Sequence, residues 1–403
     1  MTVATSLTFA SRRADDVRLI TGVSAAHFVS HYYILVLPPV FAFVRAEYGV
    51  SYTELGLALT VFNAVSAVLQ TPAGFLVDRF NARLILAAGL LIGAAGLAVA
   101  ALVHSYWVLV AMFGLMGLGN TVYHPADYAL LSRQVSPQRI SQAYSVHTFA
   151  GLLGSAAAPA GVLFMHSLFG WRGAFLGAAL LGVVVALPLM MQRNGAPERS
   201  ASKAREGAAV DTGWRLLLST PILINFLFFT LLAFGNYGLM NFAVVALGAL
   251  HGTPAAIANA ALSGNLFMAA IGVLIGGLIA TRIRRHGLAT ALGLLSAALT
   301  ILVVSAVDLG TLLLILTMSL TGMSFGIIMP SRDMLVREFT PPGAFGKVFG
   351  FVTNGFNIGG ILSPLLFGAL MDHGQPRLVF WVIALSALAC IATVASLPHR
   401  RAV

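Results

Sequence analysis

The sequence predicts an all-α membrane protein in which twelve transmembrane helices form two pseudo-symmetric six-helix bundles. Composition, charge distribution and an internal repeat support this fold class. Of the 403 residues, 59% are hydrophobic and only 9% are charged, with a mean hydropathy of +0.91, whereas a soluble domain carries roughly 25% charged residues. A soluble class is therefore excluded. The recurring apolar stretches are long enough for helices that cross a hydrocarbon core of roughly 30 Å.

Apolar segments alternate with polar breaks along the whole chain. The first half contains six such segments, at residues 17–44, 52–77, 83–103, 106–131, 138–167 and 171–192. Six more follow at residues 217–249, 254–281, 287–306, 309–335, 344–372 and 376–397. The stretch between the halves is rich in charge, glycine and small residues, which is typical of a linker. We therefore expect an N-terminal bundle at 1–192, a cytoplasmic linker at 193–213 and a C-terminal bundle at 214–403.

Basic residues are distributed unequally between alternate connections. Of the 23 Lys and Arg residues, all but Arg45, Arg172 and Arg377 fall on the side that also holds both termini and the linker. The positive-inside rule assigns that side to the cytoplasm. We expect a multi-pass protein of the cell inner membrane with both termini cytoplasmic. The net charge of +10 then orients the chain in the bilayer and does not indicate nucleic-acid binding.

The second half repeats the helix-breaking residues of the first half at one constant offset. Gly117, Pro125, Pro137, Gly154 and Pro159 recur as Gly322, Pro330, Pro342, Gly359 and Pro364. Such a shared register is independent of hydropathy. It predicts that the two bundles are structural copies, as in proteins built from parallel six-helix repeats.

The connection after the second segment carries a recognisable motif at residues 74–83. It resembles the signature of the major facilitator superfamily, with matches at Gly74, Leu76, Asp78, Arg79 and Arg83. Asn81 and Ala82 depart from the glycine and the first basic residue of that signature. Asparagine tolerates a left-handed turn, so we expect Asn81 to replace the glycine in such a turn. The resemblance implies the major facilitator fold and a secondary transporter.

The same resemblance implies a gate formed by Gly74, Asp78, Arg79 and Arg83. Asp78 is placed to cap a helix end or to pair with a neighbour, and Arg79 offers a forked donor to a carboxylate. Asp127 stands where the family carries the acid that closes this latch, so the resemblance assigns it as the partner.

Two further stretches resemble particular groups within the superfamily. Gly151, Gly154, Ala158, Pro159 and Gly161 are similar to the antiporter signature, although helix packing explains these residues equally well. The stretches Ser30-His31, Leu69-Gln70 with Pro72 and Gly74, and Tyr123-His124-Pro125 resemble fosmidomycin resistance proteins. That resemblance implies proton-driven efflux of a small anionic compound.

Polar side chains within the apolar segments are candidates for a substrate-binding cavity, because such residues are costly in a bilayer. These candidates are His27, His31, Tyr32, Asn120, Tyr123, His124, His147, Asn236, Tyr237, Asn265, Arg332, Asn354 and Asn357. No Asp or Glu falls in the middle of a segment, which argues against a cation cargo. Asp333 beside Arg332 is the expected neutralising neighbour of that charge.

Histidine is the one candidate whose charge changes near neutral pH, so proton coupling is assigned to His27, His31, His124 or His147. Each could equally be a packed ring bonded to the backbone. His27 and His31 are four residues apart and share a helix face, where they could also chelate a metal. Because neither cysteines nor nearby carboxylates accompany them, the sequence predicts no metal and no cofactor.

The leading prediction is a proton-coupled exporter of a small, anionic organic compound or drug. Uptake of an organic anion by proton symport or by facilitated diffusion stays open, as does a membrane metal or haem protein that uses the buried histidines. An enzyme is not expected, because no nucleophile, base and acid gather at one depth. The expected partners are a small-molecule substrate, protons and the lipid bilayer, and we expect a monomer.

Overall fold

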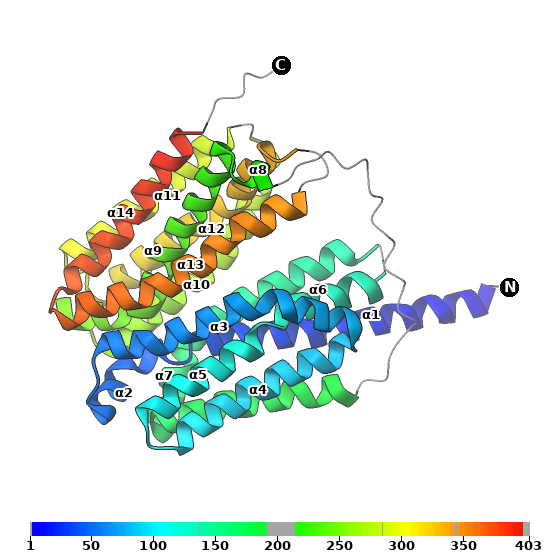
Figure 1. Cartoon of the computed structure of the whole chain (residues 1–403), viewed down its shortest axis with the longest axis horizontal. Helices are drawn as coiled ribbons and strands as arrows, with labels where there is room; N and C mark the ends of the chain where they lie inside the picture. Colours follow the sequence, from blue (N-terminus) through cyan, green and yellow to red (C-terminus); the bar gives the residue numbers. More distant parts are fainter. Residues whose placement is uncertain (1, 137, 192–213, 284, 342–344, 398–403) are drawn as a thin grey trace. The chain divides into compact units, whose positions relative to one another are not determined.

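The computed structural model describes residues 2–136, 138–191, 214–283, 285–341 and 345–397, and this part of the chain is helical throughout, without a strand. The predicted linker at 193–213 and the repeated Pro137 and Pro342 lie outside the described residues. The elements are α1 (Thr2–Ile34), η1 (Pro38–Val40), α2 (Phe41–Tyr48), α3 (Tyr52–Arg79), α4 (Ala82–Leu102), α5 (Tyr106–Asn120), α6 (Tyr123–Gln134), α7 (Ile140–Met191), α8 (Trp214–Leu217), α9 (Thr220–His251), α10 (Ala255–Ala280), α11 (His286–Ala306), α12 (Gly310–Glu338), α13 (Phe345–Asp372) and α14 (Pro376–Ala395) (Figure 1).

Eleven stretches of the described residues are long and apolar enough to cross a membrane, and one of them is long enough to cross twice. This stretch, Gln142–Met191, has 50 residues. At about 1.5 Å per residue it is more than twice as long as the roughly 30 Å hydrocarbon core is thick. Gly170 interrupts it with φ 70° and ψ 174°, a conformation open mainly to glycine. The predicted segments 138–167 and 171–192 meet at this break, which reconciles eleven stretches with twelve crossings.

Two predicted segments are broken by proline. The first predicted segment ends as α1 at Ile34 and continues through η1, which begins with Pro38 and Pro39, into α2. The fourth predicted segment divides into α5 and α6 just before Pro125. Proline has no N–H to donate to the carbonyl four residues earlier, which here belongs to Thr121. The break therefore has a local cause, and it places His124 in the first turn of α6.

The chain groups into two compact units, one formed by Met1–Val36 with Ala64–Arg205 and the other by Leu37–Asn63 with Glu206–Val403. In the first unit, α7 packs against α1 and α4, and α6 lies against both α1 and α4. These contacts bring the polar residues of α1, α6 and α7 together.

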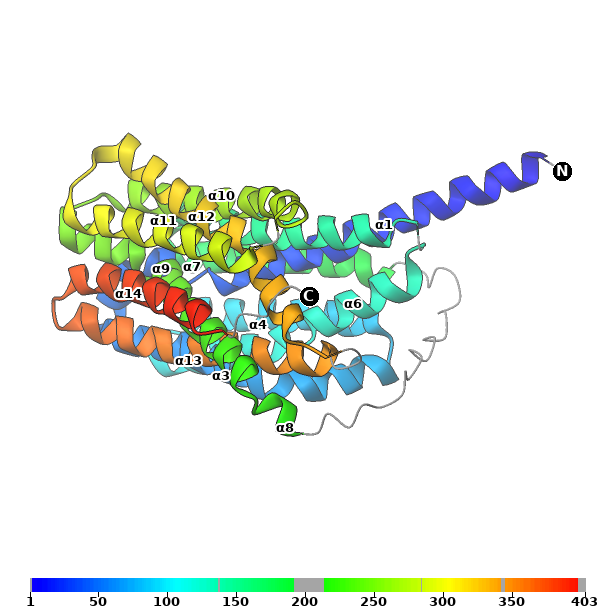
Figure 2. The same ribbon diagram turned by 90° about the horizontal axis from the view of Figure 1, so that it is seen from above.

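In the second unit, α9 packs against α13 and α14, and Figure 1 shows these three helices side by side. On another side of that unit, α12 packs against α10 and α11 (Figure 2). The N-terminal end of α3 belongs here as well. Its Tyr52 and Thr53 backbone N–H groups donate to the two carboxylate oxygens of Asp372 at 2.7 and 2.8 Å. Asp372 therefore caps the beginning of α3.

The prediction of a left-handed turn at Asn81 is wrong. Asn81 has φ −64° and ψ 107°, and its side-chain oxygen accepts hydrogen bonds from the N–H groups of Arg83 at 3.0 Å and Leu84 at 3.4 Å. Asparagine is a favoured N-cap residue because its side chain satisfies the free N–H groups of a first helical turn. Asn81 is thus the N-cap residue of α4.

Candidate functional site

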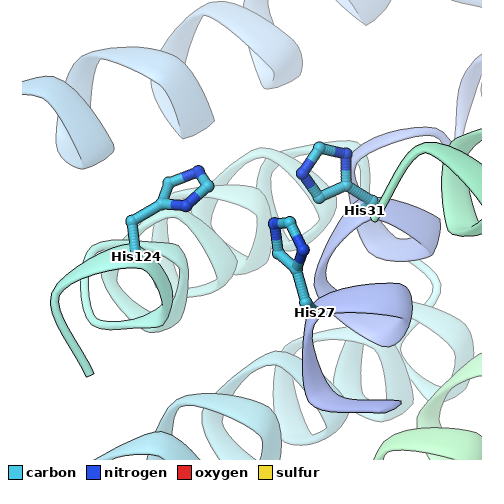
Figure 3. Close-up of side chains that lie close together, drawn as sticks. All are labelled: His27, His31 and His124. Atoms are coloured by element: carbon cyan, nitrogen blue, oxygen red, sulfur yellow. The ribbon is translucent and has the colours of Figure 1, made fainter. Parts of the chain in front are cut away.

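Four histidine side chains from three helices of the first unit gather in one cluster. The ring centroids of His27 and His31 lie 4.6 Å apart, and the His124 centroid lies 5.3 Å from that of His27 and 6.4 Å from that of His31. Figure 3 shows these three rings facing one another, with His27 and His31 on α1 and His124 on α6. The ring of His147 on α7 stacks on His27, with centroids 3.8 Å apart and planes inclined by 2°. We call these four residues the histidine cluster.

Helical spacing explains how each helix contributes to the histidine cluster. His27 and His31 are one turn apart on α1, so their side chains share a face. On α7, the spacing of four aligns His147, Gly151 and Ser155 on the face toward α1. A Cβ atom at Gly151 would lie 2.7 Å from His27 Nδ1 and 3.0 Å from His27 Nε2. A residue without a side chain is therefore needed where α7 passes the His27 ring.

A backbone carbonyl fixes the hydrogen-bonding state of His27. Nδ1 of His27 lies 2.7 Å from the carbonyl oxygen of His147, and a carbonyl can only accept, so Nδ1 carries the hydrogen and donates. The other nitrogen, Nε2, is then the basic one in a neutral ring. It is buried without a hydrogen-bond partner among the described residues, in a side chain that is only 4% exposed. The cluster thus presents an uncommitted lone pair.

Asp127 lies next to the histidine cluster, a position that the sequence did not indicate. Its Oδ2 accepts from His147 Nε2 at 2.9 Å, and both side chains are almost completely buried, at 0% and 1% exposed. Asp127 was assigned to the gate as the partner of Arg79, but in this structure His147 is its partner. The expectation that no acid lies beside the histidines is therefore corrected. Because Asp127 is buried and its Oδ2 is bonded to His147, a solute does not contact the carboxylate directly.

One side of the histidine cluster is exposed, in contrast to His27 and His147, which are buried. His124 is exposed and His31 is partly exposed, and His31 Nδ1 lies 3.0 Å from the hydroxyl oxygen of Ser155. Tyr128 borders this side, with its ring centroid 6.3 Å from that of His124 and 5.6 Å from that of His147. The ring of Tyr144 lies next to that of Tyr128, with centroids 5.5 Å apart.

Sequence reasoning missed Tyr128, Tyr144 and Ser155 as neighbours of the cluster. A signal was present for two of them, because Tyr128 follows His124 by one helical turn and Ser155 follows His147 by two. Together with the histidines they offer hydroxyl and imidazole groups that donate and accept hydrogen bonds, without an accessible carboxylate among them.

Three other candidates of the first unit contact residues of neighbouring helices. The Asn120 amide donates to the Ser66 hydroxyl at 3.2 Å, and the Tyr123 hydroxyl donates to the Gly89 carbonyl at 3.1 Å. Tyr32 is 9% exposed and lies against α7, where a Cβ at Gly161 would be 2.9 Å from its hydroxyl. These contacts join neighbouring helices, and none of the three joins the histidine cluster.

The asparagine and tyrosine candidates of the second unit are spread over three helices. Asn265 on α10 is buried and donates to the Met318 carbonyl on α12 at 2.8 Å. Asn236 on α9 donates to the Met240 sulfur at 3.2 Å. On α13, Asn357 donates to Asn354 at 3.3 Å at an exposed position. Tyr237 is partly exposed and lies against Gly360.

Arg332 on α12 pairs with Asp333, the neighbour that the sequence indicated. Its Nε and Nη2 lie 2.9 and 2.8 Å from Oδ1 of Asp333. The guanidinium also lies over the rings of Phe229, at 4.6 Å, and Phe356, at 5.4 Å. Arg332 is 9% exposed, so this salt bridge and the aromatic contacts account for most of its surroundings.

The predicted gate is described only in part. Arg83 is buried and donates to the Gln134 side chain at 3.1 Å, while Arg79 is exposed at the C-terminal end of α3. Gly74 lies within α3 with open space where a side chain would be. The side chain of Asp78 lies outside the described residues. The latch of Asp78, Arg79 and Asp127 therefore stays a prediction.

Comparison with known proteins identifies relatives along the whole chain. The family model of the Major Facilitator Superfamily matches residues 23–249 and 226–402. The chain is 24% identical to the Fosmidomycin resistance protein of Escherichia coli (strain K12), covering 95% of this chain and 93% of that protein. It is 25% identical to a protein of Cupriavidus necator named "Probable sulfoacetate transporter SauU", with 88% and 86% covered. The crystal structure of the nucleoside transporter NupG superposes with a TM-score of 0.76 at 16% identity, covering 94% of this chain and 98% of that one.

These matches cover both halves of the sequence and agree with the all-helical structure. They confirm the predicted fold class and the predicted resemblance to fosmidomycin resistance-type proteins. A membrane haem or metal protein, the other class that the sequence left open, is not retained as the function. The chain belongs to the major facilitator superfamily and is a multi-pass membrane transporter rather than an enzyme.

Proposed function

We propose that this transporter exports a small organic compound, anionic at neutral pH, in exchange for protons, and that the histidine cluster binds the cargo. The observation that carries the proposal is the arrangement of the histidine cluster itself. Three imidazoles from α1 and α6 face one another, one of them with a buried nitrogen that has no partner among the described residues. A proton bound at this nitrogen, or a hydroxyl of the cargo that donates to it, satisfies a buried polar group whose desolvation otherwise costs roughly 1–3 kcal/mol.

The charge of the accessible groups supports an anionic cargo. His124 and Tyr128 are exposed and His31 is partly exposed, whereas the nearby carboxylate, Asp127, is buried and bonded to His147. A cation would meet imidazoles and a phenol but no free carboxylate. An anion would meet groups that are neutral or positive.

Two relatives support the direction and the class of cargo. One is named for resistance to fosmidomycin, which is consistent with export, and another for transport of sulfoacetate, an organic anion. Protons are the proposed driving ion because histidine is the side chain that gains or loses a proton near neutral pH.

Uptake of an organic anion together with protons is the second candidate. Exchange requires the proton and the cargo to compete for the protein, whereas co-transport requires each to favour binding of the other. A site that presents imidazoles without an accessible carboxylate attracts anions best when it also holds a proton. That property favours co-transport, and the two modes are separated by the direction of the gradient that drives flux.

The test is flux of labelled fosmidomycin into liposomes that contain the purified protein, under an imposed pH gradient. Exchange predicts accumulation when the lumen is more acidic than the outside, and co-transport predicts accumulation when the outside is more acidic. A His124→Gln variant should reduce the flux at low cargo concentration. His373→Gln should leave it unchanged, because His373 is exposed just beyond the end of α13, where its Nδ1 donates to the Ala369 carbonyl oxygen. Flux that ignores the gradient contradicts proton coupling.

A further inference from the structure

The histidine cluster contains three ring nitrogens with the spacing of a metal-binding set. The ligand atoms of His27, His31 and His124 all lie within 4.8 Å of one another. They come from two helices and point toward a common centre (Figure 3). Nitrogens bound to one tetrahedral Zn²⁺ at about 2.0–2.1 Å lie about 3.3 Å apart. Modest rotation of the side chains, above all of the exposed His124, brings the set to that separation.

The hydrogen bond that His27 donates prepares its side chain to bind a metal. Its Nδ1 donates to the His147 carbonyl at 2.7 Å, which leaves the lone pair on Nε2. Metal-bound histidines almost always donate their other ring N–H to a carbonyl or a carboxylate, because that bond fixes the tautomer and the ring orientation. His27 has this arrangement, and its Nε2 is buried without a partner among the described residues.

The neighbouring hydrogen bonds also leave ring nitrogens of the set available to an ion. His147 stacks on His27, and its Nε2 bonds to the buried carboxylate of Asp127. Asp127 is therefore held by His147 and is not a ligand of the three-histidine set. Nδ1 of His31 lies 3.0 Å from Ser155 Oγ, which leaves its Nε2 for the ion. Exposed His124 and partly exposed His31 provide a route from solvent.

We propose that His27, His31 and His124 bind a divalent transition-metal ion of the kind that prefers imidazole, such as Zn²⁺. Imidazole ligands suit zinc, copper and nickel, whereas calcium and magnesium require oxygen ligands. Three protein ligands leave a fourth position for water or for an anionic oxygen. This inference does not depend on the direction of transport. A bound ion would occupy His27 Nε2 in place of the proton or the cargo hydroxyl that the proposed function assigns to it.

A second set of ligand atoms, from His27, Asp127 and His147, is also compact. It is the weaker candidate for two reasons. Asp127 and His147 already bond to each other at 2.9 Å, and all three side chains are buried, so an ion has no exposed ligand through which to enter. The two sets share His27 but differ in their other members, which makes them separable by substitution.

The experiment uses full-length protein in detergent, purified through a tag without histidines and stripped with a chelator. Bound Zn²⁺ is measured after equilibrium dialysis by elemental analysis. We expect one Zn²⁺ per chain, at least tenfold weaker binding in His27→Gln, His31→Gln and His124→Gln, and unchanged binding in His373→Gln and Asp127→Asn. Binding should also weaken as pH falls, because protons compete for the imidazole lone pairs.

Folding of each variant is checked by size-exclusion chromatography and thermal unfolding, and His124→Gln is the decisive variant because His124 is exposed. Wild-type protein without stoichiometric Zn²⁺ overturns the proposal. So does binding that persists in His124→Gln but is lost in Asp127→Asn, since that result assigns the ion to the buried set.

Discussion

Gly151 determines how closely α7 passes the His27 ring. The ideal Cβ position at Gly151 lies 2.7 Å from His27 Nδ1, too close for two unbonded heavy atoms. We predict that Gly151→Ala lowers the free energy of unfolding by about 1–3 kcal/mol, as overpacked sites do. Gly350→Ala is the matched control, because nothing lies within 4 Å of its Cβ position. Thermal unfolding in detergent measures both, and a Gly151→Ala protein as stable as Gly350→Ala contradicts the packing at this point.

The buried pair of Asp127 and His147 should stabilise the fold through mutual dependence. Removing one partner leaves the other buried without its bond, which costs about 3–5 kcal/mol when a buried pair is broken. We predict that Asp127→Ala and His147→Ala are each destabilising by about that amount, and that the double variant is less destabilised than the sum. Chemical denaturation of the four proteins gives the interaction energy. Additive losses would show that the two side chains do not act as a pair.

The sequence predicted part of this residue-level arrangement. Helical spacing was sufficient to bring His27 and His31 to one face, because that relation is local. The bond between His147 and Asp127 depends on how α6 packs against α7 and on the break at Pro125, neither of which follows from spacing within one helix. Asp127 was therefore assigned by resemblance to the gate, and the structure gives it a different partner.

At the scale of elements, Pro125 orients the first turn of α6 and with it His124. We predict that Pro125→Ala permits α5 and α6 to join into one straighter helix and lowers the affinity for the transported cargo severalfold, with little loss of stability. Pro330 is the matched control, because this repeat partner lies inside the unbroken α12. Concentration-dependent flux in liposomes measures the effect. Equal affinities in Pro125→Ala and Pro330→Ala would mean that the break does not position His124.

The beginning of α3 depends on a cap from another helix. Asp372 accepts hydrogen bonds from Tyr52 N, Thr53 N and Thr53 Oγ1, where a negative charge also interacts favourably with the helix dipole. We predict that Asp372→Ala costs about 1 kcal/mol of stability, as loss of an N-cap does. Asp308→Ala, which removes a single bond to Gly310 N at 3.2 Å, should cost less. Thermal unfolding of both variants decides, and equal melting temperatures contradict the capping role.

Most helices were predictable because an apolar run of about 20 residues in a bilayer has few alternatives to a helix. The interruptions were less predictable. Gly170 separated two predicted segments as expected, but Pro38, Pro39 and Pro125 fell inside segments that hydropathy alone reads as continuous. Proline is tolerated in many membrane helices. Here Pro72 and Pro330 lie within unbroken helices, and Pro159 lies within the part of α7 that precedes the break at Gly170. Which proline interrupts a helix depends on its neighbours.

At the scale of the whole molecule, the two halves share packing but not chemistry. Gly154 lies where α7 meets the Phe28 backbone of α1, and its repeat partner Gly359 lies where α13 meets α9. The constant offset that relates these glycines also relates Asp127 to Arg332. An acid bonded to histidine in one unit thus corresponds to an arginine bonded to Asp333 in the other. The halves thus share glycines that permit close helix packing, whereas the corresponding residues Asp127 and Arg332 have different partners.

The central claim, proton-coupled transport, is tested most directly by following the lumen of liposomes that contain the protein and a trapped pH-sensitive dye. Fosmidomycin is added outside, without any initial pH gradient. Exchange predicts that cargo entering the vesicle drives protons out, so that the lumen becomes more alkaline, and His27→Gln should abolish the change. A lumen that becomes more acidic would establish co-transport instead of exchange, and an unchanged pH during measured cargo entry would contradict proton coupling altogether.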